Sequence, residues 1–258
     1  MTSLGRCVLG IAAIWLGLVG LAWGEFATVW HPVQDYTPFR TPLAYLTAVA
    51  LIACGLAIQW RRTAGPGLLV LTVFFTIFAL LWTPRIVLLP HIVATWAGFA
   101  EQFAIAIAAF LTWRDLKEDA QAGHVATALR IIFGVCAILW AFNHFTNIPQ
   151  TASMVPGWIP GGGGFWAWAT GFGHLLAGLA LLSGILAALA SRLLAAMFAV
   201  FQLCIWLPGL LSAPRDHVIW SGNGVNLAAV AAALLLAEHL ARRRAAPKEE
   251  SVREVPAG

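Results

Sequence analysis

The stretch from residue 67 to residue 88 reads GLLVLTVFFTIFALLWTPRIVL and contains a single charged residue, Arg85. A helix of about 20 apolar residues is long enough to cross the roughly 30 Å of hydrocarbon in a bilayer. This stretch therefore predicts a membrane-spanning helix. Seven other apolar runs predict further spans, at residues 8–30, 43–60, 92–113, 127–146, 165–190, 192–212 and 218–240.

The composition of the whole chain agrees with this prediction. Of its 258 residues, 60% are hydrophobic and only 10% are charged, and the mean hydropathy is +0.83. Soluble domains carry about 25% charged residues. We therefore expect an all-α integral membrane protein with eight transmembrane helices.

The distribution of basic residues predicts the orientation in the membrane. If the N-terminus is inside, 12 Lys and Arg residues fall in the inner segments and only Arg40, Arg85 and Arg215 fall in the outer loops. This asymmetry follows the positive-inside rule. It predicts a multi-pass protein of the cell (inner) membrane with both termini cytoplasmic. The net charge of +4 therefore indicates contact with the lipid bilayer and not with nucleic acid.

The chain resembles itself at an offset of 123 or 124 residues, which predicts an internal repeat. Four segments of the first half recur in the second: Arg6–Gly10 at Arg130–Gly134, Gly55–Ala57 at Gly178–Ala180, Leu81–Pro84 at Ile205–Pro208, and Trp96–Gly98 at Trp220–Gly222. Each half contains four spans, so both enter the membrane in the same direction and are expected to be related by an axis along the membrane normal. We predict two parallel four-helix repeats, residues 1–122 and 123–245, and a disordered cytoplasmic tail, residues 246–258.

The first 24 residues also fit a secretory signal peptide, because Arg6 precedes an apolar run that ends in small residues. The recurrence of Arg6–Gly10 at Arg130–Gly134 favours a first span instead.

The second half contains several motifs that carry a family resemblance. They are Asn143-His144-Phe145, the loop MVPGWIP at residues 154–160, FWAW at residues 165–168, Gly171 and Gly178–Ala180. With them, this half resembles the DoxX-like membrane protein family, and the first half resembles it more weakly at Gly24–Phe26, Tyr36–Pro38 and Leu43–Tyr45. The resemblance implies a four-span unit. Members of that family include a subunit of a quinone-linked thiosulfate oxidoreductase and eukaryotic cargo-handling membrane proteins.

Glu101 is the clearest candidate for chemistry within a span. Counted at 1.5 Å per residue from the outer end of its span, it lies about 15 Å deep, near the midplane. An ionisable residue at that depth is energetically costly and is therefore a functional candidate. Two roles remain open: a hydrogen bond between helices, or proton transfer and ligand binding.

Glu25 and His144 occupy similar places in the motifs Gly24-Glu25-Phe26 and Asn143-His144-Phe145. If the halves face each other about a pseudo-twofold axis, this carboxylate and this imidazole could meet and perform acid–base chemistry. We therefore predict Glu101, Glu25 and His144 as catalytic residues. The alternative for the pair is a structural hydrogen bond or contact with lipid headgroups.

A second group of polar and aromatic residues inside spans is predicted to bind a cofactor, with a quinone as the candidate. These residues are His174, Asn223, Asn226, Trp82 and Trp206. The histidines show neither HxH nor HxxxH spacing, so we predict no metal site. The four cysteines form no CxxC pair, which indicates packing residues and not a disulfide relay.

Two classes of function therefore remain open. The first is a membrane component of a redox system that binds a quinone-like lipophilic molecule, with a membrane redox partner or a second copy of the chain as candidate partners. The second is a non-enzymatic protein that binds or transports a small hydrophobic molecule, or that supports assembly of another protein.

Overall fold

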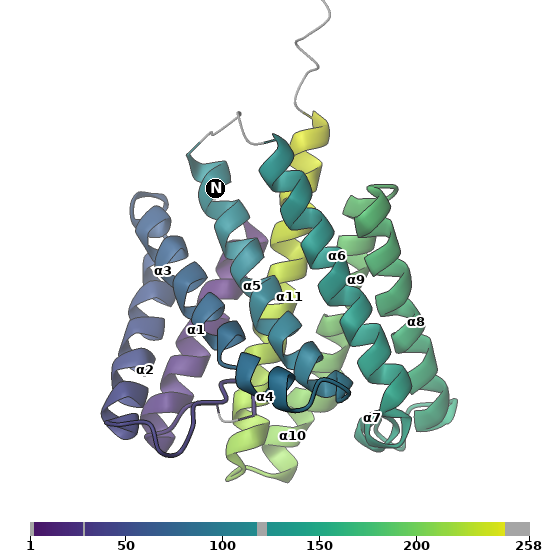
Figure 1. The fold of residues 1–258 in the computed structure, drawn as a ribbon, viewed down its shortest axis with the longest axis horizontal. Coiled ribbons are helices and arrows are strands. Elements are labelled where there is room, and N and C mark those ends of the chain that lie inside the picture. Colours follow the sequence, from purple (N-terminus) through teal and green to yellow (C-terminus); the bar gives the residue numbers. More distant parts are fainter. Residues whose placement is uncertain (1–2, 28, 118–122, 246–258) are drawn as a thin grey trace, which may run out of the picture.

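The structure is a computed structural model that describes residues 3–27, 29–117 and 123–245 (Figure 1). The described part is predominantly helical and contains no strand. Its first half holds α1 (Leu4–Trp23), α2 (Arg40–Ala57), α3 (Arg61–Leu80), α4 (Thr83–Leu88) and α5 (Val93–Leu116). Its second half holds α6 (Gly123–Thr146), α7 (Ile148–Met154), α8 (Gly162–Ser183), α9 (Ala187–Phe201), the π-helix η1 (Gln202–Trp206), α10 (Leu207–Ser212) and α11 (His217–Ala245).

The predicted all-α membrane fold is confirmed, because eight helical stretches among the described residues are long and apolar enough to cross a membrane. Two of them are interrupted. α3 and α4 together form the span Arg61–Leu88, and α9, η1 and α10 form the span Ala187–Ser212. The predicted tail, residues 246–258, lies outside the described residues.

Two spans end earlier than the hydropathy predicts, and a glycine explains each end. α1 ends before Gly24, which has a φ of 63°, and α8 ends before Gly184, which has a φ of 79°. Glycine adopts this left-handed conformation without steric cost and commonly terminates helices. The predicted ends at residues 30 and 190 were therefore each seven residues too late.

The helices pack in the same order in both halves of the chain. α1 packs on α2 and α3 on α5 in the first half, while α6 packs on α8 and α9 on α11 in the second. Between the halves, α1 packs against α11, α6 against α5, and α5 against α11. The last long helix of each half therefore lies at the centre of the bundle (Figure 1).

Glycine pairs let the first two helices of each half approach closely. A Cβ atom added to Gly55 would lie 2.6 Å from the carbonyl oxygen of Gly10, and one added to Gly178 would lie 2.9 Å from that of Gly134. Small residues at such positions allow the backbones of membrane helices to touch. α1 and α2, and likewise α6 and α8, therefore pack backbone to backbone.

A tryptophan near the start of the last helix of each half makes the same hydrogen bond to the preceding loop. Trp96 Nε1 donates to the carbonyl oxygen of Pro90 over 3.0 Å, and Trp220 Nε1 donates to that of Pro214 over 3.0 Å. These bonds fasten the start of α5 and of α11 to the loop before it.

Both ends of the described chain lie at one end of the bundle, because Gly5 N donates to Glu238 Oε1 over 3.0 Å. We call this the termini end. The short helices α4, α7 and α10 lie at the opposite end, which we call the α7 end (Figure 1).

Candidate functional site

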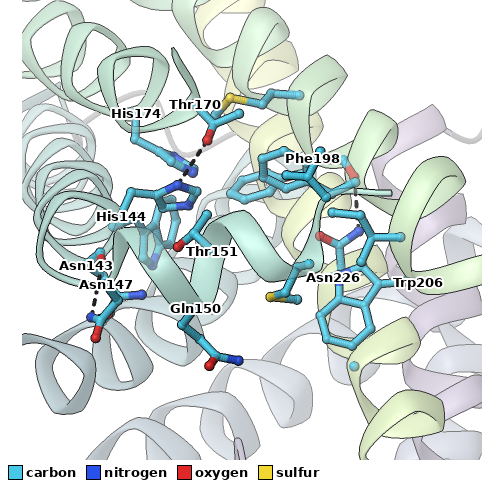
Figure 2. Close-up of a pocket in the computed structure, with 18 of the residues that line it drawn as sticks. Asn143, His144, Asn147, Gln150, Thr151, Thr170, His174, Phe198, Trp206 and Asn226 are labelled. Carbon is cyan, nitrogen blue, oxygen red and sulfur yellow. Dashed lines mark hydrogen bonds between the residues drawn. The ribbon is translucent and has the colours of Figure 1, made fainter. Parts of the chain in front are cut away.

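A cavity of about 700 Å³ lies towards the α7 end and is lined by residues of both halves of the chain. The first half contributes Val29, Trp30, Trp82, Ala94, Ala97, Gly98 and Glu101, and the second half contributes residues of α6 to α9, η1 and α11. Ligand pockets in proteins commonly measure about 300–1,000 Å³. We call this space the central cavity; Figure 2 shows a close-up of part of its lining.

Aromatic rings form much of the wall of the central cavity. Trp30 and Trp206, one from each half, meet edge to face with ring centroids 5.8 Å apart. Trp82 and Trp206, both predicted from the sequence to bind a cofactor, line the cavity. The other rings in its wall are those of Trp140, Trp166, Phe198 and Phe201.

His144 is held by a hydrogen bond that determines which ring nitrogen carries the proton. Thr170 Oγ1 lies 3.0 Å from His144 Nδ1 and 2.7 Å from the carbonyl oxygen of Trp166 (Figure 2). A carbonyl only accepts and Trp166 is the closer partner, so we assign the single hydroxyl proton of Thr170 to Trp166. With this assignment, His144 Nδ1 donates to Thr170 Oγ1. The neutral ring therefore has an unprotonated Nε2, which can accept a proton or a hydrogen bond from a ligand.

His174 lies beside His144 and is almost completely buried. The two imidazole centroids are 5.0 Å apart, and His174 also contacts the ring of Trp140 at 5.7 Å. Its Nδ1 has no hydrogen-bond partner among the described residues. An unpaired buried polar atom is costly, so a ligand that pairs with it would be favoured.

An amide network braces the wall formed by the π-helix. Gln202 Nε2 donates to Asn223 Oδ1 over 2.7 Å, and Asn226 Nδ2 donates to Gln202 Oε1 over 2.8 Å. Asn223 Nδ2 donates to the carbonyl oxygen of Trp206 over 2.7 Å, a backbone group within the π-helix. π-helical turns are frequent at functional sites. Of the two predicted asparagines, Asn226 lines the cavity, while Asn223 supports the wall from behind.

Several polar residues of the cavity were not predicted from the sequence. Asn147 Nδ2 donates to Asn143 Oδ1 over 2.9 Å at the junction of α6 and α7, and Gln150 and Thr151 of α7 also line the cavity. Figure 2 shows these side chains near His144. Their signal in the sequence is the polar run Asn147-Ile-Pro-Gln-Thr directly after a span.

Glu101 lines the central cavity from α5. The indole of Trp30 interacts with its carboxyl group as a hydrogen-bond donor. The structure therefore brings Glu101, His144 and His174 to one cavity from three different helices.

Glu25 lies elsewhere. It forms an ion pair with Arg40, and its Oε1 accepts from Phe26 N over 2.6 Å. It is not among the residues that line the central cavity. The structure therefore does not bring Glu25 and His144 together.

Two histidines at the α7 end, His31 and His217, are packed individually against aromatic rings. His31, in the segment between α1 and α2, stacks on Phe78 at 3.7 Å, and His217 stacks on Trp23 at 5.1 Å. Burial lowers the pKa of His31 to about 3, so this ring is neutral at physiological pH. Within the described residues, no three His, Cys, Asp or Glu side chains are grouped so that they could hold a metal ion.

Residues 125–207, which include most of α6, all of α7 to η1 and the start of α10, match the family model described as DoxX. Searches among curated proteins and among solved structures gave no match to this chain.

Proposed function

We propose that this DoxX-like membrane protein binds a ring-shaped lipophilic molecule of the quinone class in its central cavity, as a membrane component of a redox system. The match to the family model supports a membrane protein. The central cavity supports the more specific assignment.

One observation carries this proposal: an aromatic-walled cavity into which three different helices bring protonatable side chains. Glu101, His144 and His174 all line it, and its volume of about 700 Å³ is in the usual range for small-molecule pockets. Aromatic walls favour stacking with a flat ring. Buried polar groups at fixed positions would hold the oxygens of that ring.

The chemistry of a quinone fits this set of residues. Reduction of a quinone to a quinol takes up two electrons and two protons, and oxidation of the quinol releases them. A partner protein of the membrane would supply or accept the electrons. Glu101 and His144 would exchange the protons, because a carboxyl group and an imidazole are the usual proton donors and acceptors in proteins. The proposal gives Glu25 no part in this exchange.

The hydrogen bond of His144 to Thr170 gives the proposed site a preference for the reduced ligand, the quinol, over the oxidised quinone. Because Nδ1 is occupied as a donor to Thr170, Nε2 of the neutral ring is an acceptor. A quinol hydroxyl can donate to it, whereas a quinone carbonyl cannot. His144 is therefore placed to bind the reduced ligand and to take its proton.

The first test is whether the purified protein contains a quinone. We expect mass spectrometry of extracts of the purified protein to find a quinone in near-stoichiometric amount. Added decylubiquinone should quench tryptophan fluorescence with saturation, because five of the 13 tryptophans line the cavity. Ala169→Phe, which fills the cavity from α8, should abolish saturable quenching.

Leu176→Phe is the matched control, because Leu176 lies on the same helix but is 65% exposed. If Ala169→Phe and wild type bind decylubiquinone equally, the cavity is not the site. If a different hydrophobic molecule is recovered and decylubiquinone does not compete with it, the protein belongs to the second class, the non-enzymatic binders and transporters.

We also infer that residues 1–122 and 123–245 are tandem copies of one four-helix unit. Equal helix order in the two halves and equivalent bonds from Trp96 and Trp220, which are 124 residues apart, support this inference. The central cavity would then lie between the two copies, as in other membrane proteins built from repeats.

For the orientation, we propose that the termini end faces the cytoplasm in the cell (inner) membrane. The excess of basic residues in the segments at that end supports this topology. A reporter active only in the cytoplasm should be active when fused after Gly258, and inactive when inserted in the loop before α8. The opposite pattern would reverse the topology.

A further inference from the structure

A second cavity, of about 220 Å³, lies at the termini end of the bundle. It lies between the first turns of α6, the junction of α8 and α9, and the last turns of α11, and its lining includes Arg130, Arg243 and His239. We propose that this cavity binds a phosphate group, carried by an anionic lipid or by free phosphate. This proposal is independent of the function of the central cavity.

Two guanidinium groups line this phosphate cavity. Arg130 donates to the carbonyl oxygen of Leu181, and Arg243 Nη1 donates to that of Gly123 over 3.3 Å. Each guanidinium has five N–H donors in a planar fork, so these bonds position the two groups and leave donors for a ligand. Arginine is well suited to bind phosphate because its fork matches two phosphate oxygens.

His239 provides a buried ring nitrogen without a partner. Its side chain is 5% exposed, and its Nδ1 lies 2.8 Å from Asp115 Oδ1. A carboxylate only accepts, so Nδ1 carries a proton. Nε2 is buried and has no partner among the described residues. When this nitrogen is also protonated, it needs an acceptor, and a phosphate oxygen in the cavity would supply one.

The first turn of α9 adds backbone donors. Ala187 and Ala188, which line the cavity, are the first two residues of this 15-residue helix. The residue before them, Leu186, makes no side-chain capping bond. The N–H groups at a helix start have no partner within the helix, and together with the helix dipole they attract anions.

No acidic side chain lines the phosphate cavity among the residues that the structure describes. The nearby carboxylate of Asp115 is already engaged by His239 and by Arg242, which donates to it over 2.6 Å. At the repeat offset of 124 residues, the position in the first half that corresponds to His239 is Asp115, which carries a carboxylate and not an imidazole. The first half of the chain therefore does not reproduce this set of donors.

The position of the cavity suits both sources of phosphate. α11 leaves the bundle here, at the level where lipid headgroups meet water if α11 spans the membrane. Basic pockets between membrane helices at this level commonly bind anionic headgroups. Free phosphate in the aqueous phase would have the same access.

Native mass spectrometry and thermal unfolding of the full chain in detergent test the proposal. With dioleoylphosphatidylglycerol, we expect Arg243→Gln and Arg130→Gln each to weaken adduct formation about tenfold, the usual effect of losing one charged hydrogen bond. Arg62→Gln, an exposed arginine at the same end of the bundle, should have no effect. Because Arg243 is exposed, its substitution should leave the fold intact even if that of Arg130 does not.

The two sources are separated by inorganic phosphate and by dioleoylphosphatidylcholine. If inorganic phosphate, compared with chloride at equal ionic strength, raises the unfolding temperature of wild type but not of Arg243→Gln, the ligand is the free anion. If only phosphatidylglycerol discriminates the variants, the ligand is a lipid headgroup. If phosphatidylcholine binds equally well and no variant differs from wild type with either probe, the proposal is wrong.

Discussion

Thr170→Val should weaken binding of decylubiquinol about tenfold while changing the affinity for oxidised decylubiquinone much less. Thr170 accepts from His144 Nδ1 over 3.0 Å, and that bond keeps the acceptor nitrogen, Nε2, available for the ligand. Valine has nearly the same shape but cannot accept. The ring is then free to carry its proton on Nε2, where it no longer accepts from a quinol hydroxyl. Loss of one buried hydrogen bond corresponds to about 1.4 kcal/mol, or a factor of ten.

Quenching of tryptophan fluorescence, titrated separately with the oxidised and the reduced ligand, measures both affinities. His144→Phe should abolish the preference for the reduced form, because it retains the ring but removes both nitrogens. His217→Phe is the control, since this histidine is stacked on Trp23 outside the cavity. Equal losses for both redox forms in Thr170→Val would contradict the assigned tautomer and would leave the proposed site intact.

The fold was predictable from the sequence because a peptide backbone in lipid finds no water to bond with. An apolar span therefore forms an α-helix, which pairs its own N–H and C=O groups. Eight apolar runs therefore predicted eight helices. Hydropathy does not locate helix ends, because an apolar residue after Gly24 or Gly184 is as compatible with a loop at the membrane surface as with a span. In the π-helix that interrupts the span Ala187–Ser212, the carbonyl oxygen of Trp206 accepts from Asn223, which lies on another helix and which hydropathy does not place there.

The polar part of the candidate site was predictable only where a polar residue stands in an apolar span. His144, His174 and Asn226 are conspicuous for this reason, and all three line the central cavity. Thr170 was missed because a threonine within a helix usually bonds its own backbone, as it also does here with Trp166. Glu25 has the same conspicuous character as Glu101, but its ion pair with Arg40 joins the loop after α1 to the first residue of α2, and spacing along the chain does not reveal such a contact.

Gly55→Val and Gly178→Val should both destabilise the protein strongly, by about 3 kcal/mol each, the upper part of the usual range for overpacking. A Cβ at position 55 would lie 2.8 Å from Ile14 Cγ1, and one at position 178 would lie 2.6 Å from Ile138 Cγ1. In each case the added Cβ also meets a backbone carbonyl of the opposite helix, that of Gly10 or Gly134, so the clash cannot be relieved by turning a side chain. Gly164→Val in the first turn of α8 is the control, because nothing lies within 4 Å of the added Cβ and no proline follows it.

The same pair of variants tests the proposed duplication. Ile14 and Ile138 are 124 residues apart, so tandem copies of one unit predict equal contacts and losses of stability that agree within about 1 kcal/mol, a margin near the spread of measured substitution effects. Thermal unfolding of each variant in the same detergent measures these losses. A large loss for one glycine and none for the other would mean that α1–α2 and α6–α8 pack differently, and the two halves would then not be copies of one unit. Equal losses, with Gly164→Val unchanged, would require close glycine contacts at both places, because overpacking acts only where the backbones already touch.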